Sequence, residues 1–263
     1  MSKVYTSNLT YEQFQLIKPL LPPAKKGGRP RRVCMFSVIN AIFYVVVQGC
    51  KWRDLPDDFP AWQTVYTYFR NWRLDGTWDV IHQRLRSLNR VMSGREESPS
   101  EVIVDSQSVP TSTMVNKAVG YDTYKATKGR KRNTVVDTLG LVMCVLVTAA
   151  NVPEREAGKQ VLGRLQHLGE QVRRLYLVWV DGGYSGEPFL RFVMDTFGWI
   201  VQLVLRPEES KGFILLKKRW VVERTFGWWN WYRRLSQDYE YLPQNSETMI
   251  YIAMIRLMVR RLA

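Results

Sequence analysis

The sequence that decides the fold is LVWVDGG, residues 177–183. Its first four residues are all apolar, which is typical of a strand buried on both faces and therefore central in its sheet. Asp181 follows at once, so its carboxylate is expected at the rim of the sheet, held by a rigid strand.

Two further acids stand in the same kind of place. Asp105 follows the apolar run 102–104, and Glu223 follows the apolar run 220–222. Alone, an acid after a strand is more typical of a turn or a helix cap. Three carboxylates held rigidly can share two divalent cations about 4 Å apart, which activate a water and stabilise the leaving oxygen in phosphodiester chemistry. In a basic chain this set indicates an enzyme that cuts and joins DNA.

Composition narrows the class of protein. The chain has 263 residues, 46% of them hydrophobic, which is enough for a real core, and a formal net charge of +14. That charge predicts a polyanionic partner, either nucleic acid or an anionic membrane surface. The sequence holds no apolar stretch near the ~20 residues of a spanning helix and begins without an apolar signal core. We therefore expect a soluble intracellular protein and no membrane partner.

Cysteine and histidine are scarce. The three cysteines form no CxxC pair, and the two histidines, His82 and His167, are far apart. This argues against a structural zinc site and against Ser-His or Cys-His catalysis.

Two domains are predicted. Residues 1–95 read as helices rich in Lys and Arg, which favours a helix-turn-helix-like DNA-binding domain, with a plain helical bundle as the alternative. The polar stretch 93–100 reads as a linker. The second domain, residues 96–263, alternates strands and helices. Strands are predicted at 101–105, 134–137, 141–149, 175–180 and 199–205, and helices at 154–168, 187–197, 213–234 and 246–261.

This order predicts an α/β, ribonuclease-H-like fold, a mixed sheet flanked by helices. In that topology the first and fourth strands are neighbours, so Asp105 and Asp181 would lie side by side, with Glu223 reaching them from a helix. Competing acids fit less well. Asp137 looks like a hairpin-turn residue, and Glu208 and Glu209 sit beside a proline in a predicted loop.

Several segments resemble the DDE transposases of bacterial insertion sequences, in the insertion-sequence-five-like group. They are residues 55–56 and 62–66, 120–122 and 128–132, 136–140, 181–186, 220–226, 232–235 and 238–240. The match covers nearly the whole chain. In the related signature Tyr-x2-Arg-x3-Glu-x6-Lys, Arg219 and Glu223 fit, whereas Leu216 and Asn230 replace the Tyr and the Lys.

The resemblance implies a transposase with Asp105, Asp181 and Glu223 as catalytic and metal-binding residues. It would hold two Mg²⁺ ions, which Mn²⁺ can replace, and would cleave and transfer DNA strands. Its partners would be the terminal inverted repeats and the target DNA, bound by a homodimer in the bacterial cytoplasm at the nucleoid. The alternatives are a ribonuclease-H-like nuclease without joining activity and a DNA-binding regulator that has lost catalysis.

Basic residues near these motifs are predicted to bind DNA. They lie in the arm 25–32, in the loop 117–132, and around Glu223, where Arg233 or Arg234 would take the place of the missing Lys. The set is Arg29, Arg31, Arg32, Lys125, Lys128, Arg130, Lys131, Arg132, Arg219, Arg224, Arg233 and Arg234. Trp228, Trp229 and Trp231 cannot all face one side of a helix, so one of them could stack on a displaced base, with core packing as the alternative.

Overall fold

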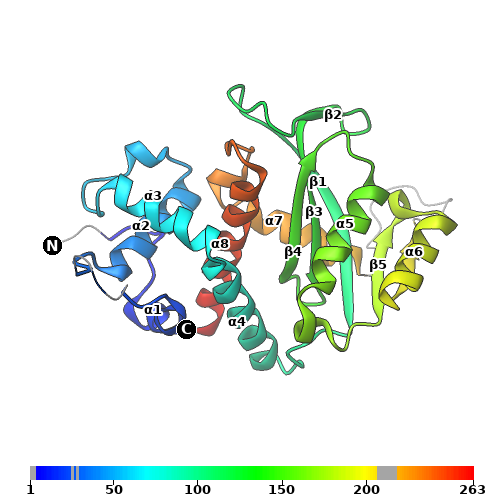
Figure 1. The fold of residues 1–263 in the computed structure, drawn as a ribbon, viewed down its shortest axis with the longest axis horizontal. Coiled ribbons are helices and arrows are strands. Elements are labelled where there is room, and N and C mark those ends of the chain that lie inside the picture. The colour runs from blue at the N-terminus through cyan, green and yellow to red at the C-terminus, as the bar shows by residue number, and fades with distance from the viewer. Residues whose placement is uncertain (1–3, 25–26, 28–29, 206–217) are drawn as a thin grey trace.

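A mixed sheet occupies one side of the molecule in the computed structural model, which describes residues 4–24, 27, 30–205 and 218–263 (Figure 1). Within these residues it has six strands: β1 (Glu101–Pro110), β2 (Gly120–Asp122), β3 (Thr127–Asp137), β4 (Val142–Ala149), β5 (Leu177–Asp181) and β6 (Ile200–Val204). The order β3-β1-β5-β6 continues on the far side of β3 with β4 and the short β2. β1, β5 and β6 run parallel, and β3 is antiparallel to both β1 and β4. This is the predicted ribonuclease-H-like arrangement.

Strand alternation divides the sheet between two cores. Val102 and Val104 of β1 face one side, where they pack with α5 (Glu154–Gln166) and α6 (Glu187–Phe197). Ile103, between them, faces the other side together with α7 (Arg219–Trp229) and α8 (Pro243–Leu262). Helices therefore cover both faces, which is why the apolar run 102–104 before Asp105 is buried.

The described residues of the N-terminal region contain four α-helices: α1 (Tyr11–Ile17), α2 (Met35–Gln48), α3 (Trp62–Leu74) and α4 (Thr77–Met92). Thr10 caps α1 with a capping box. A short turn joins α3 to α4, and in it Gly76 adopts a left-handed conformation with φ of 78°. A longer connection, residues 49–61, joins α2 to α3. The helical character predicted for this region is confirmed.

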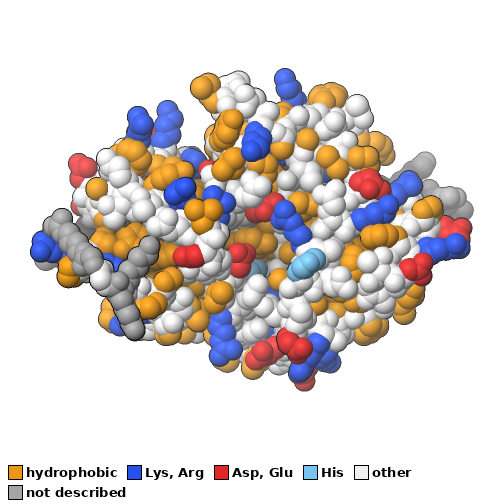
Figure 2. Space-filling view, in the orientation of Figure 1, with side chains coloured by type: hydrophobic (Ala, Val, Ile, Leu, Met, Phe, Trp, Pro, Cys, Tyr) orange, Lys and Arg blue, Asp and Glu red, His pale blue; other side chains and the backbone are white. Residues whose placement is uncertain are grey.

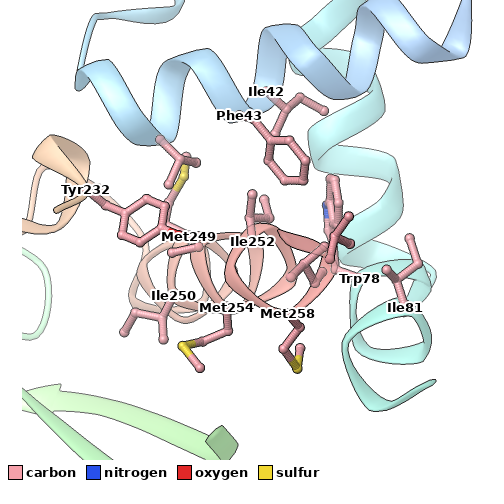
Figure 3. Close-up of a cluster of buried hydrophobic side chains, with 14 of the residues drawn as sticks. Ile42, Phe43, Trp78, Ile81, Tyr232, Met249, Ile250, Ile252, Met254 and Met258 are labelled. Atoms are coloured by element: carbon pink, nitrogen blue, oxygen red, sulfur yellow. The ribbon is translucent and has the colours of Figure 1, made fainter. Parts of the chain in front are cut away.

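The C-terminal helix α8 packs among the N-terminal helices. Figure 3 shows Ile252 of α8 pointing toward Phe43 of α2, and both belong to one hydrophobic cluster with Met258 of α8 and Trp78 of α4. Ile250 of α8 belongs to the same cluster, which continues onto the sheet. The boundary at residue 95 stays a prediction, but the two halves of the chain share this core.

Some element bounds differ from those predicted. β1 continues to Pro110, and the predicted loop 117–132 contains β2 and the beginning of β3. The reason is pairing, because β1 and β3 stay hydrogen-bonded from Val102↔Asp137 to Pro110↔Gly129. The predicted helix 213–234 ends at Trp229, and its first five residues lie outside the described part of the chain. α8 begins at Pro243, a residue suited to the first helical turn.

Candidate active site

Asp105 and Asp181 come from the two central strands. β1 pairs in parallel with β5 through Ile103↔Trp179, and the same register continued by two residues brings Asp105 opposite Asp181. In parallel strands, residues in register point to the same face. The two carboxylates therefore converge, as the strand order predicted.

Both carboxylates are fixed by backbone hydrogen bonds. The amide of Ser106 donates to Asp105 Oδ1 over 2.7 Å, and the amide of Gly183 donates to Asp181 Oδ1 over 3.0 Å. Asp105 is buried, and burial, followed by the negative charge of Asp181, raises its pKa to about 7. Two acids that repel each other in this way favour a cation at the site.

Glu223 lies on α7, one turn beyond Arg219. The Arg219 Nε is 3.2 Å from Glu223 Oε1, and its Nη2 is 3.7 Å from Asp181 Oδ2. The Glu223 side chain is 51% exposed. One guanidinium thus bridges the second and the third predicted acid.

The donor set fits a hard divalent cation, since carboxylate oxygens are the ligands that Mg²⁺ and Mn²⁺ prefer. Asp105 and Asp181 already converge. Among the described residues, however, no three Asp, Glu, His or Cys side chains lie close enough together to hold a metal ion. Glu223 is directed to Arg219, so its approach to the other two acids requires the Arg219 contact to change.

A pocket of about 850 Å³ adjoins Asp181. Asp181 and Arg219 form part of its wall, Lys125 and Lys131 reach it from the β2–β3 region, and Glu154 reaches it from the start of α5. Acidic and basic groups therefore face the same space. Such a mixed lining can hold a cation and a phosphate together.

Glu154 was missed by the sequence reasoning. Its Oε1 accepts a hydrogen bond from Ser106 Oγ over 3.1 Å. A Cβ placed on Gly183 would lie 1.7 Å from Glu154 Oε2, so any larger residue there would displace this carboxylate. The sequence does carry a signal for Glu154, because this acid lies a few residues after the mainly apolar run 141–150. The three predicted acids likewise come after apolar runs.

Asp122 was also missed. It accepts hydrogen bonds from the amides of Tyr124 and Lys125 and forms an ion pair with Lys131, whose Nζ is 3.4 Å from Asp122 Oδ2. The sequence carries no signal for this pair, which depends on the fold of the β2–β3 hairpin. Lys131 is consequently held at the wall of the pocket.

The competing acid Asp137 is a turn residue, as interpreted from the sequence. Its Oδ1 accepts from the amides of Leu139 and Leu141, both over 2.9 Å, and Arg90 Nη1 lies 2.5 Å from its Oδ2. Asp137 is fully buried, and its carboxylate is used by the turn and by Arg90 rather than by the predicted metal site. Glu208, Glu209 and Leu216 lie outside the described residues.

Some predicted DNA-binding residues are accessible. Lys125 and Arg219 line the pocket, whereas Lys131, which also reaches it, is buried and paired with Asp122. Lys128, Arg31, Arg32 and Arg233 are exposed, and Arg31 Nη1 also donates to the carbonyl of Pro22 over 3.2 Å. Figure 2 shows Lys and Arg side chains along the upper edge of that face, above α3 and near β2. Arg29 lies outside the described residues.

Other predicted DNA-binding residues have internal partners instead. Arg130 is fully buried, with Nη1 3.1 Å from Asp238 Oδ1, and it donates to the carbonyls of Glu240 and Tyr241. Arg132 is buried as well and donates to the carbonyl of Leu235, and burial lowers its pKa to about 10. Neither guanidinium can reach a phosphate from this position.

Arg234 and Arg224 are engaged too. Arg234 donates from Nε to Glu240 Oε1 over 2.7 Å and from Nη1 to the carbonyl of Cys50. Arg224 donates to the carbonyl of Leu139 and stacks on Trp228. Arg130, Arg132, Arg224 and Arg234 are therefore not among the residues that we propose to contact DNA.

The three tryptophans after Glu223 have separate environments. Trp229 is buried in the larger core, and Trp228 is partly buried between Arg224 and Arg261. Trp231 lies on the surface.

None of the helices in the described residues is both long and apolar enough to span a membrane.

Two protein families match the chain. Residues 9–82 match the family described as "Putative transposase of IS4/5 family", and residues 96–258 match "Transposase DDE domain". The first match ends at residue 82, within α4, and the second begins at residue 96, before β1.

Two relatives from Burkholderia cepacia are similar in sequence. The "Insertion element IS402 uncharacterized 16.2 kDa protein" is 33% identical over 104 residues, which are 37% of this chain and 69% of that protein. The "Putative transposase for insertion sequence element IS402" is 30% identical over 122 residues, 45% of this chain and 57% of that protein. The chain thus spans little more than half of the second relative.

Among solved structures, the "Crystal structure of the Mos1 Strand Transfer Complex" superposes with a TM-score of 0.26 and 14% identity. The alignment covers 68% of this chain and 60% of that one. This similarity is too low to establish a shared fold. The ribonuclease-H-like fold is assigned from the strand order instead.

Proposed function

Because the chain belongs to the DDE transposases of insertion sequences, we propose that it binds the terminal inverted repeats of such an element and catalyses metal-dependent cleavage and transfer of DNA strands. The observation that carries the proposal is the convergence of Asp105 and Asp181 on adjacent central strands, beside a helix that carries Glu223.

Asp105, Asp181 and Glu223 are the proposed catalytic residues and metal ligands. Mg²⁺, or Mn²⁺ in its place, would supply an activated water and stabilise the leaving oxygen when two ions are bound. Asp105 and Asp181 are already held rigidly in position by their strands. Glu223 would exchange its contact with Arg219 for the cation site, which leaves Arg219 free to bind a DNA phosphate.

The accessible cations near the pocket are the proposed phosphate contacts. Lys125 and Arg219 line it, and Lys128 is exposed on β3 close by, while Lys131 reaches the same pocket but is buried against Asp122. Arg31 and Arg32, beside α3, would contact DNA from the N-terminal helices. These contacts position the backbone and carry no sequence information directly.

Further partners follow from the proposed reaction. Transposition joins two element ends to a target, so we propose a homodimer on double-stranded DNA, acting at the nucleoid. Inverted repeats in the DNA that flanks the coding region would support this assignment.

A strand-transfer assay tests the proposal against its nearest alternatives. The wild-type chain should nick the element end only when Mg²⁺ or Mn²⁺ is present, and should join pre-cleaved ends to a target plasmid. Nicking without joining would indicate a nuclease of the same fold. End binding without nicking in either metal would indicate a regulator and contradict the proposal.

A further inference from the structure

The segment 230–242, which connects α7 to α8 and is called here the aromatic loop, directs large rings into solvent. Trp231 is 83% exposed, Tyr241 59% and Tyr239 39%. Its other large apolar groups behave differently, since Tyr232 and Leu235 are buried in the core. The exposed rings therefore belong to a segment that is otherwise anchored.

Buried ionic contacts hold the aromatic loop in place. Asp238 pairs with Arg130 and accepts the hydroxyl proton of Ser246, whose Oγ lies 2.7 and 2.8 Å from its two carboxylate oxygens. Glu240 pairs with Arg234 over 2.7 Å. Rings on a backbone held this firmly lose little conformational freedom when they bind a ligand.

The backbone contacts extend these anchors to the sheet. Arg132 donates to the carbonyl of Leu235 over 2.9 Å, and the amide of Asp238 donates to the carbonyl of Pro110, the last residue of β1, over 2.9 Å. The arginines of β3 predicted to bind DNA thus hold the loop that presents the rings.

Exposed cations lie around the rings, and one exposed acid, Asp54, lies near Cys50. Both acids of the loop point inward, while Arg233 is exposed. Lys117 is exposed next to Tyr241, because Arg130 Nη2 donates to the carbonyls of both residues. On the other side, Arg234 donates to the carbonyl of Cys50, and the exposed Lys51 follows directly.

We infer that the aromatic loop binds unpaired bases of DNA, with Trp231 as the main stacking surface and Tyr239 and Tyr241 beside it. Rings interleaved with cations are the combination that binds single strands, because every base offers a flat face and every nucleotide a phosphate. Bases inside a duplex have their faces covered by their neighbours. The rings therefore select frayed or displaced nucleotides over paired ones.

The location is consistent with such a role. The aromatic loop follows α7, which carries Glu223, and contacts residues 49–50 beside the N-terminal helices. DNA that extends from those helices to the acids would pass it. The inference takes from the proposed function only that the ligand is DNA.

The test uses fluorescence of 2-aminopurine, a base analogue that is quenched when it stacks on an aromatic ring. The full-length protein is titrated into a single-stranded oligonucleotide and into a matched duplex, each carrying the analogue. Wild type should quench the single strand. Trp231→Ala should lose the quenching and bind the single strand about tenfold more weakly, with duplex affinity changed less than twofold. Trp231→Phe, which keeps a ring, should retain most of both signals.

Tyr176→Ala is the matched control. Tyr176 is also exposed but precedes β5, at the end of the strand opposite Asp181, and should bind as wild type does. Equal quenching and affinity in wild type and in a folded Trp231→Ala variant would overturn the inference, as would a variant whose only change is loss of self-association. Nicking of a fully paired end by the same samples reports on the proposed function separately, because it does not require the rings.

Discussion

At Asp105, the strand that holds the carboxylate rigidly also makes it costly to ionise. Burial and the nearby Asp181 raise its pKa to about 7. The position of this acid was predictable from the sequence, because it follows an apolar run. Its raised pKa was not, because that depends on the neighbouring strand and on the depth of burial.

Replacing Asp105 with Asn should stabilise the metal-free protein. The folded-state pKa lies above the ordinary value of 3.8, so ionisation costs stability, and the full cost is present above pH 7 and declines as the pH falls toward 4. Asp105→Asn should therefore raise the melting temperature in EDTA by about 3–10 °C at pH 8, and by about a third of that at pH 5. Thermal denaturation at the two pH values measures both.

Glu187→Gln provides the control, since Glu187 is an exposed carboxylate on α6 paired only with Arg191. It should leave the melting temperature nearly unchanged. A lower melting temperature for Asp105→Asn than for wild type at pH 8 in EDTA would show that ionisation of the Asp105 carboxyl does not destabilise the folded protein.

Among the elements, β3 departs most from its sequence-based interpretation. Residues 128–132 are almost continuously basic, which is typical of a solvated DNA-binding loop. In the structure they form a strand paired on both sides, and Arg130 and Arg132 are buried. Partners such as Asp238, which lie about a hundred residues later in the chain, stabilise the buried arginines. No local sequence pattern could therefore predict these contacts.

Arg130→Ala should therefore destabilise the protein rather than merely weaken DNA binding. It leaves the buried Asp238 without its ion pair, which typically costs about 3–5 kcal/mol. We expect a fall in melting temperature of roughly 6–20 °C. Lys128→Ala, two residues away and exposed, should change it by at most about 1–2 °C. Similar melting temperatures for the two variants would contradict the structural role of Arg130.

Over the whole molecule, the strand order and the neighbouring positions of Asp105 and Asp181 were predictable from the alternation of apolar runs and helices. The shared core was not. Ile252 and Met258 of α8 pack against the N-terminal helices (Figure 3), a contact between the two ends of the chain that no local periodicity encodes. Glu223 was predicted to reach the other two acids, but in the structure it pairs with Arg219 one turn away, as oppositely charged residues at this spacing readily do.

We propose that three carboxylates, carried by β1, β5 and α7, perform metal-dependent strand cleavage. The most direct test is the single-turnover nicking rate of a labelled element end in Mn²⁺ for Asp105→Asn, Asp181→Asn, Glu223→Gln and the control Glu187→Gln. We expect the first three to lose at least about a thousandfold in rate, on the order of 4 kcal/mol of transition-state stabilisation, with end binding retained, and the control to match wild type. Wild-type nicking by any one of the three would contradict the assignment.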